Sequence, residues 1–362
     1  MLLWLLAFVF SINAEPKPQG GISGHLMNIL QNIHSNSKQH IKIEIDTENT
    51  KDIHTEITYL DFTNLPASVL SILGSHKSDF VTFGKTYAKK ISRSNGDKAA
   101  TNFVSNNGYL KDLLKKNLYY KVGMHPYMDL DEEETLALAA LKSAKRFVKK
   151  QENTRKRRDD EEESSDDELP ESFDWRDKDV VPEVKNQGSC GSCWAFATAA
   201  CMEIQYAREN NEIIDLSEQQ MTCVYPNKKT ICKGGFPSVA FNHYMDDGIG
   251  LESDSPYDPS GDLRCYSFKQ RLSVSSVTDL LPFDMDTVKR AIVNDGPIAV
   301  GMYINWNFMY YDGGIFDTSC EDLSGLGGHA MVITGYGVED DYPYWIVRNS
   351  WGTSWEKMAM LG

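Results

Sequence analysis

The ten residues QGSCGSCWAF, from Gln187 to Phe196, constrain this chain more than any other segment. Two small residues come directly before Cys193, and the alanine-rich run from Cys193 to Gln205 predicts a helix that begins at this thiol. The positive end of a helix dipole favours the thiolate form of a cysteine placed there. Gln187 lies six residues earlier, and its side-chain amide can donate a hydrogen bond toward the same point. The segment therefore predicts a nucleophilic thiol with an oxyanion-stabilising donor beside it.

The cysteines and the N-terminus together predict an exported protein. All 7 cysteines lie between Cys190 and Cys320. The run from Met1 to Phe10 is almost wholly apolar, and Ser11 to Ala14 is polar and small, which is typical of a signal peptide cleaved after Ala14. The alternative for this run is a buried helix. In an exported chain, clustered cysteines predict disulfides. No later segment is long and apolar enough to span a membrane.

The formal net charge of −15 is concentrated in the C-terminal half. Residues 169–362 carry 28 acidic and 14 basic side chains, whereas residues 1–168 carry 24 acidic and 23 basic ones. An acidic surface repels phosphate groups, so nucleic acid and anionic membranes are excluded as partners of this half.

A charge reversal separates the two halves of the chain. The basic run RKRR, Arg155 to Arg158, is followed by the acidic run DDEEESSDDE, Asp159 to Glu168. Such runs cannot pack and predict a solvated linker. The alternative is a cleavage site for a furin-like convertase after Arg158. In either case a new domain begins near Leu169.

The domain after Leu169 is expected to be helical in its first part and rich in strands in its second. A helix is predicted at Asp286–Asn294. Strands are predicted at the apolar runs Ile298–Ile304, Ala330–Thr334 and Tyr344–Val347.

Two further side chains complete a set suited to covalent catalysis by Cys193. His329 lies among small residues in GGHAMVITGYG, and Asn349 ends an apolar run in YWIVRNSWG. An amide can hold one imidazole nitrogen while the other faces the sulfur, and Trp351 can shield that hydrogen bond from water. Cys190 and Cys193 also match a redox C-x-x-C pattern, but the βαβ context of such a site is missing. No second cysteine or histidine pair completes a metal site.

Residues from about Leu169 to Trp355 resemble a papain-family (cathepsin-like) cysteine protease. The matching segments are SFDWR, VKNQGSCGSCWAF, LSEQQMTC, CKGGFP, GPIAV, GGIF, GGHAMVITGYG and YWIVRNSWG. The resemblance implies an α+β, papain-like fold of two lobes, one helical and one barrel-like, with the cleft between them. It implies Cys193 as nucleophile, with its own amide and Gln187 forming the oxyanion hole. It also implies His329 as general acid and base and Asn349 as the residue that orients it.

The resemblance also implies how substrate is held. Gly234 and Gly235 would offer backbone hydrogen bonds to an extended peptide. The main specificity pocket would be lined by Phe236, Pro237, Gly301 and Ala330. Because this lining is apolar, we expect a bulky apolar residue second before the scissile bond.

Cysteine pairing follows from the same resemblance. The implied disulfides are Cys190 with Cys232 and Cys223 with Cys265. Cys201 is expected to be a buried free thiol. Cys320 stands at a family disulfide position, and its expected partner lies beyond the end of this sequence.

The match weakens before and after this region. The predicted helix Asn102–Asn117 keeps Phe103, Asn106 and Leu110 of the pattern of inhibitory propeptides, but Asn95 and Ala99 replace the expected Glu and Arg. Gly123, Tyr127 and Asp129 resemble the G-x-N-x-F-x-D motif, with His125 and Tyr127 substituted. The alternative is an unrelated helical domain. After Trp355 the family pattern is lost, so the C-terminal strand or strands are expected to be missing and the barrel edge open.

We therefore expect five segments: a signal peptide (1–14), an extension of unknown role (15–79), a degenerate inhibitory propeptide (80–134), a helix and charged linker (135–168, with the helix at Leu136–Lys150), and the peptidase domain (169–362). A pair of strands is expected within the extension, at Ile41–Ile45 and Ile57–Phe62.

The predicted function is a cysteine endopeptidase made as a zymogen, without cofactor or metal. Its partners would be protein or peptide substrates and its own propeptide as inhibitor, and it would be a monomer in the secretory pathway, lysosomal or extracellular. The first alternative is a catalytically impaired relative that binds peptides without turnover. The second is a propeptide-type inhibitor with an inert passenger domain.

Overall fold

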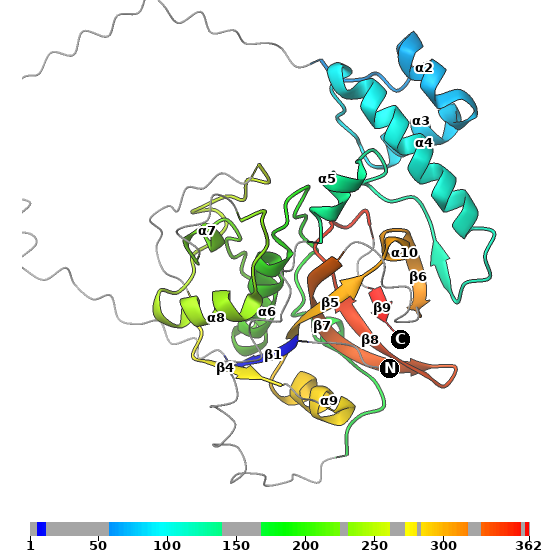
Figure 1. Cartoon of the computed structure of the whole chain (residues 1–362). Helices are drawn as coiled ribbons and strands as arrows, with labels where there is room; N and C mark the ends of the chain where they lie inside the picture. The colour runs from blue at the N-terminus through cyan, green and yellow to red at the C-terminus, as the bar shows by residue number, and fades with distance from the viewer. Residues whose placement is uncertain are drawn as a thin grey trace, which may run out of the picture.

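A computed structural model of the chain describes residues 6–11, 58–139, 168–224, 231–260, 272–280, 284–317, 327–355 and 359–361. Figure 1 shows a central sheet, a group of helices against one side of it, and a separate helical group formed by the segment before the domain that begins near Leu169. We call residues 58–139 the prosegment.

Three helices form the body of the prosegment: α2 (Ala67–Leu73), α3 (Lys77–Thr86) and α4 (Gly96–Leu113). They pack around the fully buried rings of Phe80, Phe83 and Phe103, whose centroids lie 5.1–6.1 Å apart. The helix predicted at Asn102–Asn117 lies largely within α4. Phe80, near which the sequence places the start of the propeptide, lies inside α3 and shares an apolar core with α2.

Two other expectations for this region fall largely outside the described residues. The strand pair predicted near Ile41 cannot be placed, and of its second member the structure shows only an isolated bridge between Tyr59 and Ser92. The helix predicted from Leu136 starts where the short helix α5 (Glu132–Leu136) ends, and residues 137–139 do not continue it. Asp131 caps the start of α5 and exchanges hydrogen bonds with Glu134. This capping box sets where the helix begins.

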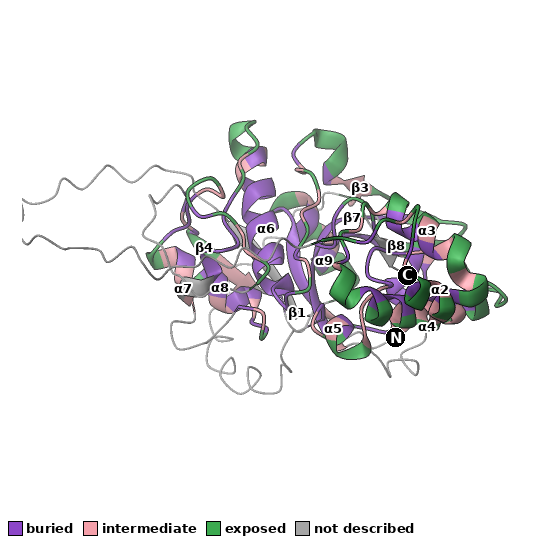
Figure 2. Cartoon of the chain, turned by 90° about the horizontal axis from the view of Figure 1, so that it is seen from above, coloured by how far each residue is buried: buried purple, intermediate pink, exposed green. Residues whose placement is uncertain are grey.

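The helical lobe of the peptidase domain is built on α6 (Cys193–Asn210). Figure 2 shows α6 buried along most of its length, and Trp194 is completely buried. The helix ends at Asn211, which adopts the left-handed conformation (φ 54°) that terminates many helices. It packs against α8 (Pro237–Asp246) and against the sheet, with the short helix α7 (Met221–Val224) beside α8.

The described residues form a sheet of nine strands in the order β2-β6-β9-β8-β7-β5-β1-β4, with β3 paired to β7. Their bounds are β1 Leu6–Ser11, β2 Tyr120–Val122, β3 Phe173–Asp174, β4 Ser276–Asp279, β5 Ile298–Ile304, β6 Tyr311–Phe316, β7 Gly327–Glu339, β8 Tyr342–Arg348 and β9 Ala359–Leu361. The elements η5 (Trp175–Lys178), α9 (Met285–Asn294) and α10 (Trp306–Met309) complete this lobe. The strands predicted in the C-terminal half fall on β5, β7 and β8, and the predicted helix falls on α9.

A two-residue turn joins β7 to β8. Asp340 and Asp341 have φ values of 51° and 67°, and they connect β7 directly to β8. Positive φ at both positions is the type I′ geometry whose twist matches that of the flanking strands. The turn thereby sets the register that brings the residues on β7 opposite those on β8.

Two expectations about this lobe are corrected. The described strands do not close into a barrel, because the path ends at β2 on one side and β4 on the other. The strand expected to be missing after Trp355 is present as β9, which is parallel to β6 and antiparallel to β8. Departure from the family pattern in this region therefore does not prevent strand pairing, because Ala359, Met360 and Leu361 still supply an extended apolar run.

The apolar N-terminal run also joins the sheet. Residues Leu6–Ser11 form β1, antiparallel to β4 on one side and β5 on the other. The alternative of a buried helix for this run is wrong. The expectation that it is a signal peptide remains a prediction. Within the described part of the chain, no helix combines the length and the apolar character needed to cross a membrane.

Candidate active site

The thiol of Cys193 lies at the first residue of α6, at the seam between the helical lobe and the sheet. Its side chain is completely buried, and the backbone N–H of Ala330 on β7 lies 3.5 Å from Sγ. Because Ala330 follows His329 in β7, this contact places the thiol beside the strand segment that carries the imidazole. The helix N-terminus supplies a positive potential that stabilises a thiolate.

The imidazole of His329 is held by Asn349, directly after β8. His329 Nε2 lies 2.8 Å from Asn349 Oδ1, and both side chains are buried. Among the described residues Nδ1 has no hydrogen-bond partner, so it is the nitrogen left available for a proton exchange. Burial lowers the pKa of His329 to about 4, although Asn349 and the Leu138 carbonyl favour the charged ring.

Trp351 covers this pair. Its ring centroid lies 4.9 Å from that of His329, at an interplanar angle of 35°, and its side chain is fully buried. Trp351 itself packs against Phe308 and Trp355. An aromatic layer therefore separates the His329–Asn349 hydrogen bond from solvent, which strengthens it.

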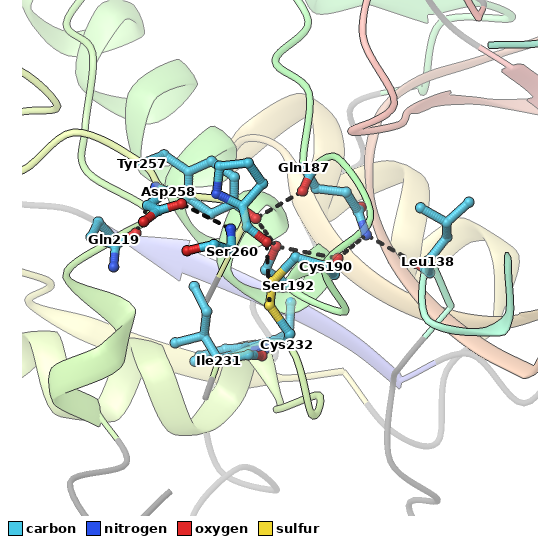
Figure 3. Close-up of a disulfide and its surroundings, with 12 residues drawn as sticks. Leu138, Gln187, Cys190, Ser192, Gln219, Ile231, Cys232, Tyr257, Asp258 and Ser260 are labelled. Carbon is cyan, nitrogen blue, oxygen red and sulfur yellow. Dashed lines mark hydrogen bonds between the residues drawn. A yellow bond between two sulfur atoms is a disulfide. The ribbon is translucent and has the colours of Figure 1, made fainter. Parts of the chain in front are cut away.

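Gln187 completes the group, and the prosegment reaches it. Gln187 Nε2 donates to the carbonyl oxygens of Cys190 at 2.8 Å and Leu138 at 3.0 Å (Figure 3). Ser350 Oγ donates to Gln187 Oε1 at 2.6 Å. Leu138 is fully buried and follows α5 in the prosegment. One peptide carbonyl of the prosegment thus accepts a hydrogen bond at the amide that the sequence assigns to an oxyanion hole.

Comparison with known proteins identifies the family of the chain. The sequence profile of the papain family cysteine proteases matches residues 169–360. The chain belongs to the papain family of cysteine proteases. It is 32% identical over 299 residues to thiol protease aleurain of Arabidopsis thaliana, covering 80% of each chain. It is 34% identical over 284 residues to cathepsin S of Bos taurus, covering 74% of this chain and 81% of that protein.

Solved proforms share the fold. Digestive procathepsin L 3 from the larval midgut of Tenebrio molitor has 29% identity and a TM-score of 0.66, covering 79% of this chain and 92% of the other. Digestive procathepsin L2 from the same tissue has 27% identity and a TM-score of 0.65. This papain-family chain is therefore a zymogen whose own propeptide is the inhibitor, consistent with the position of Leu138 at Gln187.

The residues implied to bind substrate lie on two parts of the fold, the segment that leads into α8 and the strands β5 and β7. Gly234 and Gly235 are buried before α8. A Cβ at Gly235 would lie 2.4 Å from the Trp194 ring, so this position requires glycine for packing. Phe236 and Pro237 begin α8 on the same side.

Gly301 and Ala330 face each other across β5 and β7. Ala330 also lines a small cavity beneath the site, which the other three implied pocket residues do not line. The lining residues are Lys185, Phe196, Ala197, Ala200, Glu203, Glu218, Ala330, Met331, Val332, Arg348, Asn349 and Ser350.

One predicted disulfide is formed near the active site. Cys190 and Cys232 are joined with an S–S distance of 2.05 Å, which ties the loop before α6 to the loop before α8. Cys201 is a buried free thiol, and burial raises its pKa well above the ordinary value. The predicted partners Cys223 and Cys265, and Cys320, lie in positions whose side chains are outside the described part of the chain.

A buried ion cluster beside the site was not predicted from the sequence. Lys185 Nζ lies 2.7 Å from Glu203 Oε1, 2.9 Å from Glu218 Oε1 and 2.6 Å from Asp215 Oδ1. Burial would lower the pKa of Lys185, but the two buried carboxylates outweigh it and raise that pKa. Glu203 follows the apolar and small residues of the first half of α6, and this acid was the available signal, because a buried carboxylate requires a cationic partner.

Proposed function

We propose that the processed chain is a cysteine endopeptidase that hydrolyses peptide bonds through a Cys193 thiolate and a His329 imidazolium. The observation that carries this proposal is the convergence of the α6 thiol and the His329–Asn349 pair at the lobe seam. Gln187 and the Cys193 amide would stabilise the oxyanion.

The proposed reaction has two stages. The Cys193 sulfur bonds to the peptide carbon while the carbonyl electron pair moves to oxygen. When the tetrahedral species collapses, the C–N bond breaks and His329 gives its proton to the leaving amine. Water then attacks the thioester, its proton passes to His329, and the sulfur leaves. Asn349 keeps one ring nitrogen occupied so that the other serves both stages.

The prosegment keeps this pair inactive by occupying the oxyanion donor. Leu138 accepts a hydrogen bond from Gln187 Nε2, so a substrate carbonyl cannot use it. Burial lowers the pKa of His329 to about 4, which disfavours an imidazolium beside a thiolate, whereas the Leu138 carbonyl acts in the opposite direction. Removal of the prosegment frees the Gln187 donor for substrate.

The test is hydrolysis of fluorogenic peptides by the processed protein, combined with labelling by a thiol-reactive epoxide. We expect rapid labelling at Cys193 at acidic pH and a preference for a bulky apolar residue second before the scissile bond. The pocket supporting that preference would combine Phe236 and Pro237 with Gly301 and Ala330. Absence of both labelling and turnover would favour the alternative, a catalytically impaired relative that binds peptides.

We propose the secretory pathway, with a lysosomal or extracellular destination, as the location of a monomeric enzyme. The Cys190–Cys232 disulfide suits an oxidising compartment. The acidic C-terminal half loses like-charge repulsion as pH falls, which suits an acidic one.

Acidification is expected to release the prosegment partly through His125. Its side chain is 3% exposed, its ring packs edge-on against Tyr310 of the peptidase domain at 4.7 Å, and its Nδ1 accepts from the Tyr127 N–H. Burial, and secondarily the Lys89 charge, lowers the pKa of His125 to about 3 in the docked state.

The sign of this effect is determined by that lowered pKa. The stability contributed by docked, neutral His125 is present above its free value of about 6.5 and is lost as pH falls toward 3. Each pH unit in that window weakens docking by about tenfold. Asp129, paired with Lys89 at 2.8 Å, has a pKa raised by burial and acts in the opposite direction.

The comparison is His125→Gln against the native chain, both with Cys193→Ala to stop self-cleavage. Limited proteolysis of the prosegment measures release between pH 7 and pH 4. We expect the native chain to open more steeply on acidification than the variant. His76→Gln is the matched control, because His76 contacts Asn107 within the prosegment. Identical pH profiles for the native chain and His125→Gln would contradict this role.

A further inference from the structure

We propose that Tyr257 is a positioning residue that holds the two halves of the oxyanion hole in register, an inference that rests on the proposed function. Its hydroxyl joins the chain at Gln187 to the chain at Ser192, the residue directly before Cys193. These are the two segments that carry the two oxyanion donors.

The direction of the hydrogen bonds can be deduced. Tyr257 Oη lies 2.8 Å from the Gln187 carbonyl oxygen and 2.7 Å from Ser192 Oγ (Figure 3). A carbonyl only accepts, so the single phenolic proton points to Gln187 and the Ser192 hydroxyl donates to Tyr257. Burial raises the pKa of Tyr257 above its ordinary value, so the proton stays in place across the working range of pH.

The loop that this hydroxyl bridges needs such a tie. It contains Gly188, with φ of 61°, and Gly191, and glycines give a backbone more freedom than other residues. The Cys190–Cys232 disulfide fixes the loop on one side, and the Gln187 side chain bonds to Cys190 within it. Among these ties, only Tyr257 reaches both the Gln187 backbone and the residue at the start of α6.

Tyr257 is itself held rigidly. Its backbone N–H donates to Glu252 Oε1 at 2.6 Å, and its ring packs edge-on against Phe196 of α6 with centroids 4.9 Å apart. The next residue, Asp258, donates its N–H to Gln219 Oε1 at 2.9 Å. Replacing the tyrosine with phenylalanine therefore removes the hydroxyl while the ring contact with Phe196 remains.

The experiment compares reactions that do and do not use the oxyanion hole, in enzyme processed from the full chain by an added acid protease. A peptide aldehyde forms a bond from Cys193 sulfur to its carbonyl carbon, and the carbonyl electron pair moves to the oxygen in the hole. Iodoacetamide alkylates the same sulfur with loss of iodide and creates no oxyanion. Only the first reaction reports the hole.

For Tyr257→Phe we expect kcat to fall about tenfold, less than the ~10²–10³-fold loss of a direct donor, because the hydroxyl acts through the loop. Aldehyde affinity should fall by a similar factor. The Michaelis constant KM and the iodoacetamide rate should change less than about twofold. In a Gln187→Ala background, the same change should add little to the loss of aldehyde affinity.

Tyr336→Phe is the matched control. The Tyr336 hydroxyl donates to the Pro170 carbonyl at 3.0 Å, away from the loop, and we expect its loss to leave all four measurements unchanged. Equal losses in aldehyde affinity and alkylation rate for Tyr257→Phe would indicate a general structural role and overturn the proposal, as would native kinetics. If the native enzyme neither hydrolyses peptides nor is alkylated at Cys193, the proposed function fails as well.

Discussion

Replacing Cys193 with alanine is expected to lower kcat of the processed protein by at least about 10⁴-fold, the scale found when a covalent nucleophile is removed. Without the sulfur no thioester can form, and the oxyanion donors alone cannot replace the lost nucleophile. The measurement is turnover of a fluorogenic peptide at acidic pH. Epoxide labelling should disappear together with turnover.

Cys201→Ala is the control for this variant. Cys201 lies on the same helix, and its thiol is buried and free, but it is two turns from the active site. We expect the Cys201→Ala variant to keep peptide hydrolysis and epoxide labelling at Cys193. Both variants should keep the far-UV circular dichroism of the native chain. If Cys193→Ala retained the native rate, Cys193 could not be the nucleophile.

Replacing Lys185 with methionine is expected to lower the free energy of unfolding by about 3–5 kcal/mol, because it leaves buried carboxylates without their cation. Glu203 and Glu218 are each 1% exposed, and both lie within hydrogen-bond distance of Lys185 Nζ. The urea midpoint of the Cys193→Ala zymogen measures the loss, provided the denaturant slope stays constant.

The loss should depend on pH in a defined direction. Burial raises the pKa of Glu218 even with Lys185 present, and removal of the lysine raises it further. A carboxyl group whose pKa is raised in the folded state takes up a proton more readily there than in the unfolded state, so its burial costs less stability as pH falls. The destabilisation should therefore be larger at pH 7 than at pH 5.

Lys98→Met is the matched control for charge removal. Lys98 pairs with Asp131 and Glu134 at the surface, where 51% of its side chain is exposed. Water already solvates these charges, so we expect almost no change in the urea midpoint. A loss at Lys98 as large as the loss at Lys185 would contradict the burial argument.

The elements of the candidate active site were predictable because their signals are local. A small-residue turn followed by an alanine-rich run defines the start of α6 at Cys193. Apolar runs define the strand that carries His329 and the strand that ends directly before Asn349. Pairing across β7 and β8 then brings the imidazole and the amide together. The order of these segments along the chain was sufficient to predict that Cys193, His329 and Asn349 belong to one site.

The residues that were not predicted depend on contacts distant in sequence. Tyr257 lies in the polar segment SDSPYDPSG, which has no periodicity, and its role appears only when its hydroxyl is seen between Gln187 and Ser192. Leu138 gives no local signal for lying at Gln187. The strand after Trp355 could not be predicted because it forms by pairing with β6 and β8, which are distant or not adjacent in sequence. The open sheet could not be predicted because it depends on which strands lie at its two edges.

The short strand β2 of the prosegment has a consequence for the mature enzyme. It pairs with β6 through Tyr120 opposite Gly314 and Val122 opposite Tyr311, with an irregular register between the two. Once the prosegment is lost, the backbone groups of β6 that paired with β2 face water. They form an unpaired strand edge that can pair with an extended polypeptide. Because the pairing of β2 with β6 has an irregular register, we expect this edge to fit the released prosegment better than a regular strand. Activation should therefore be reversible by the enzyme's own by-product until that by-product is degraded.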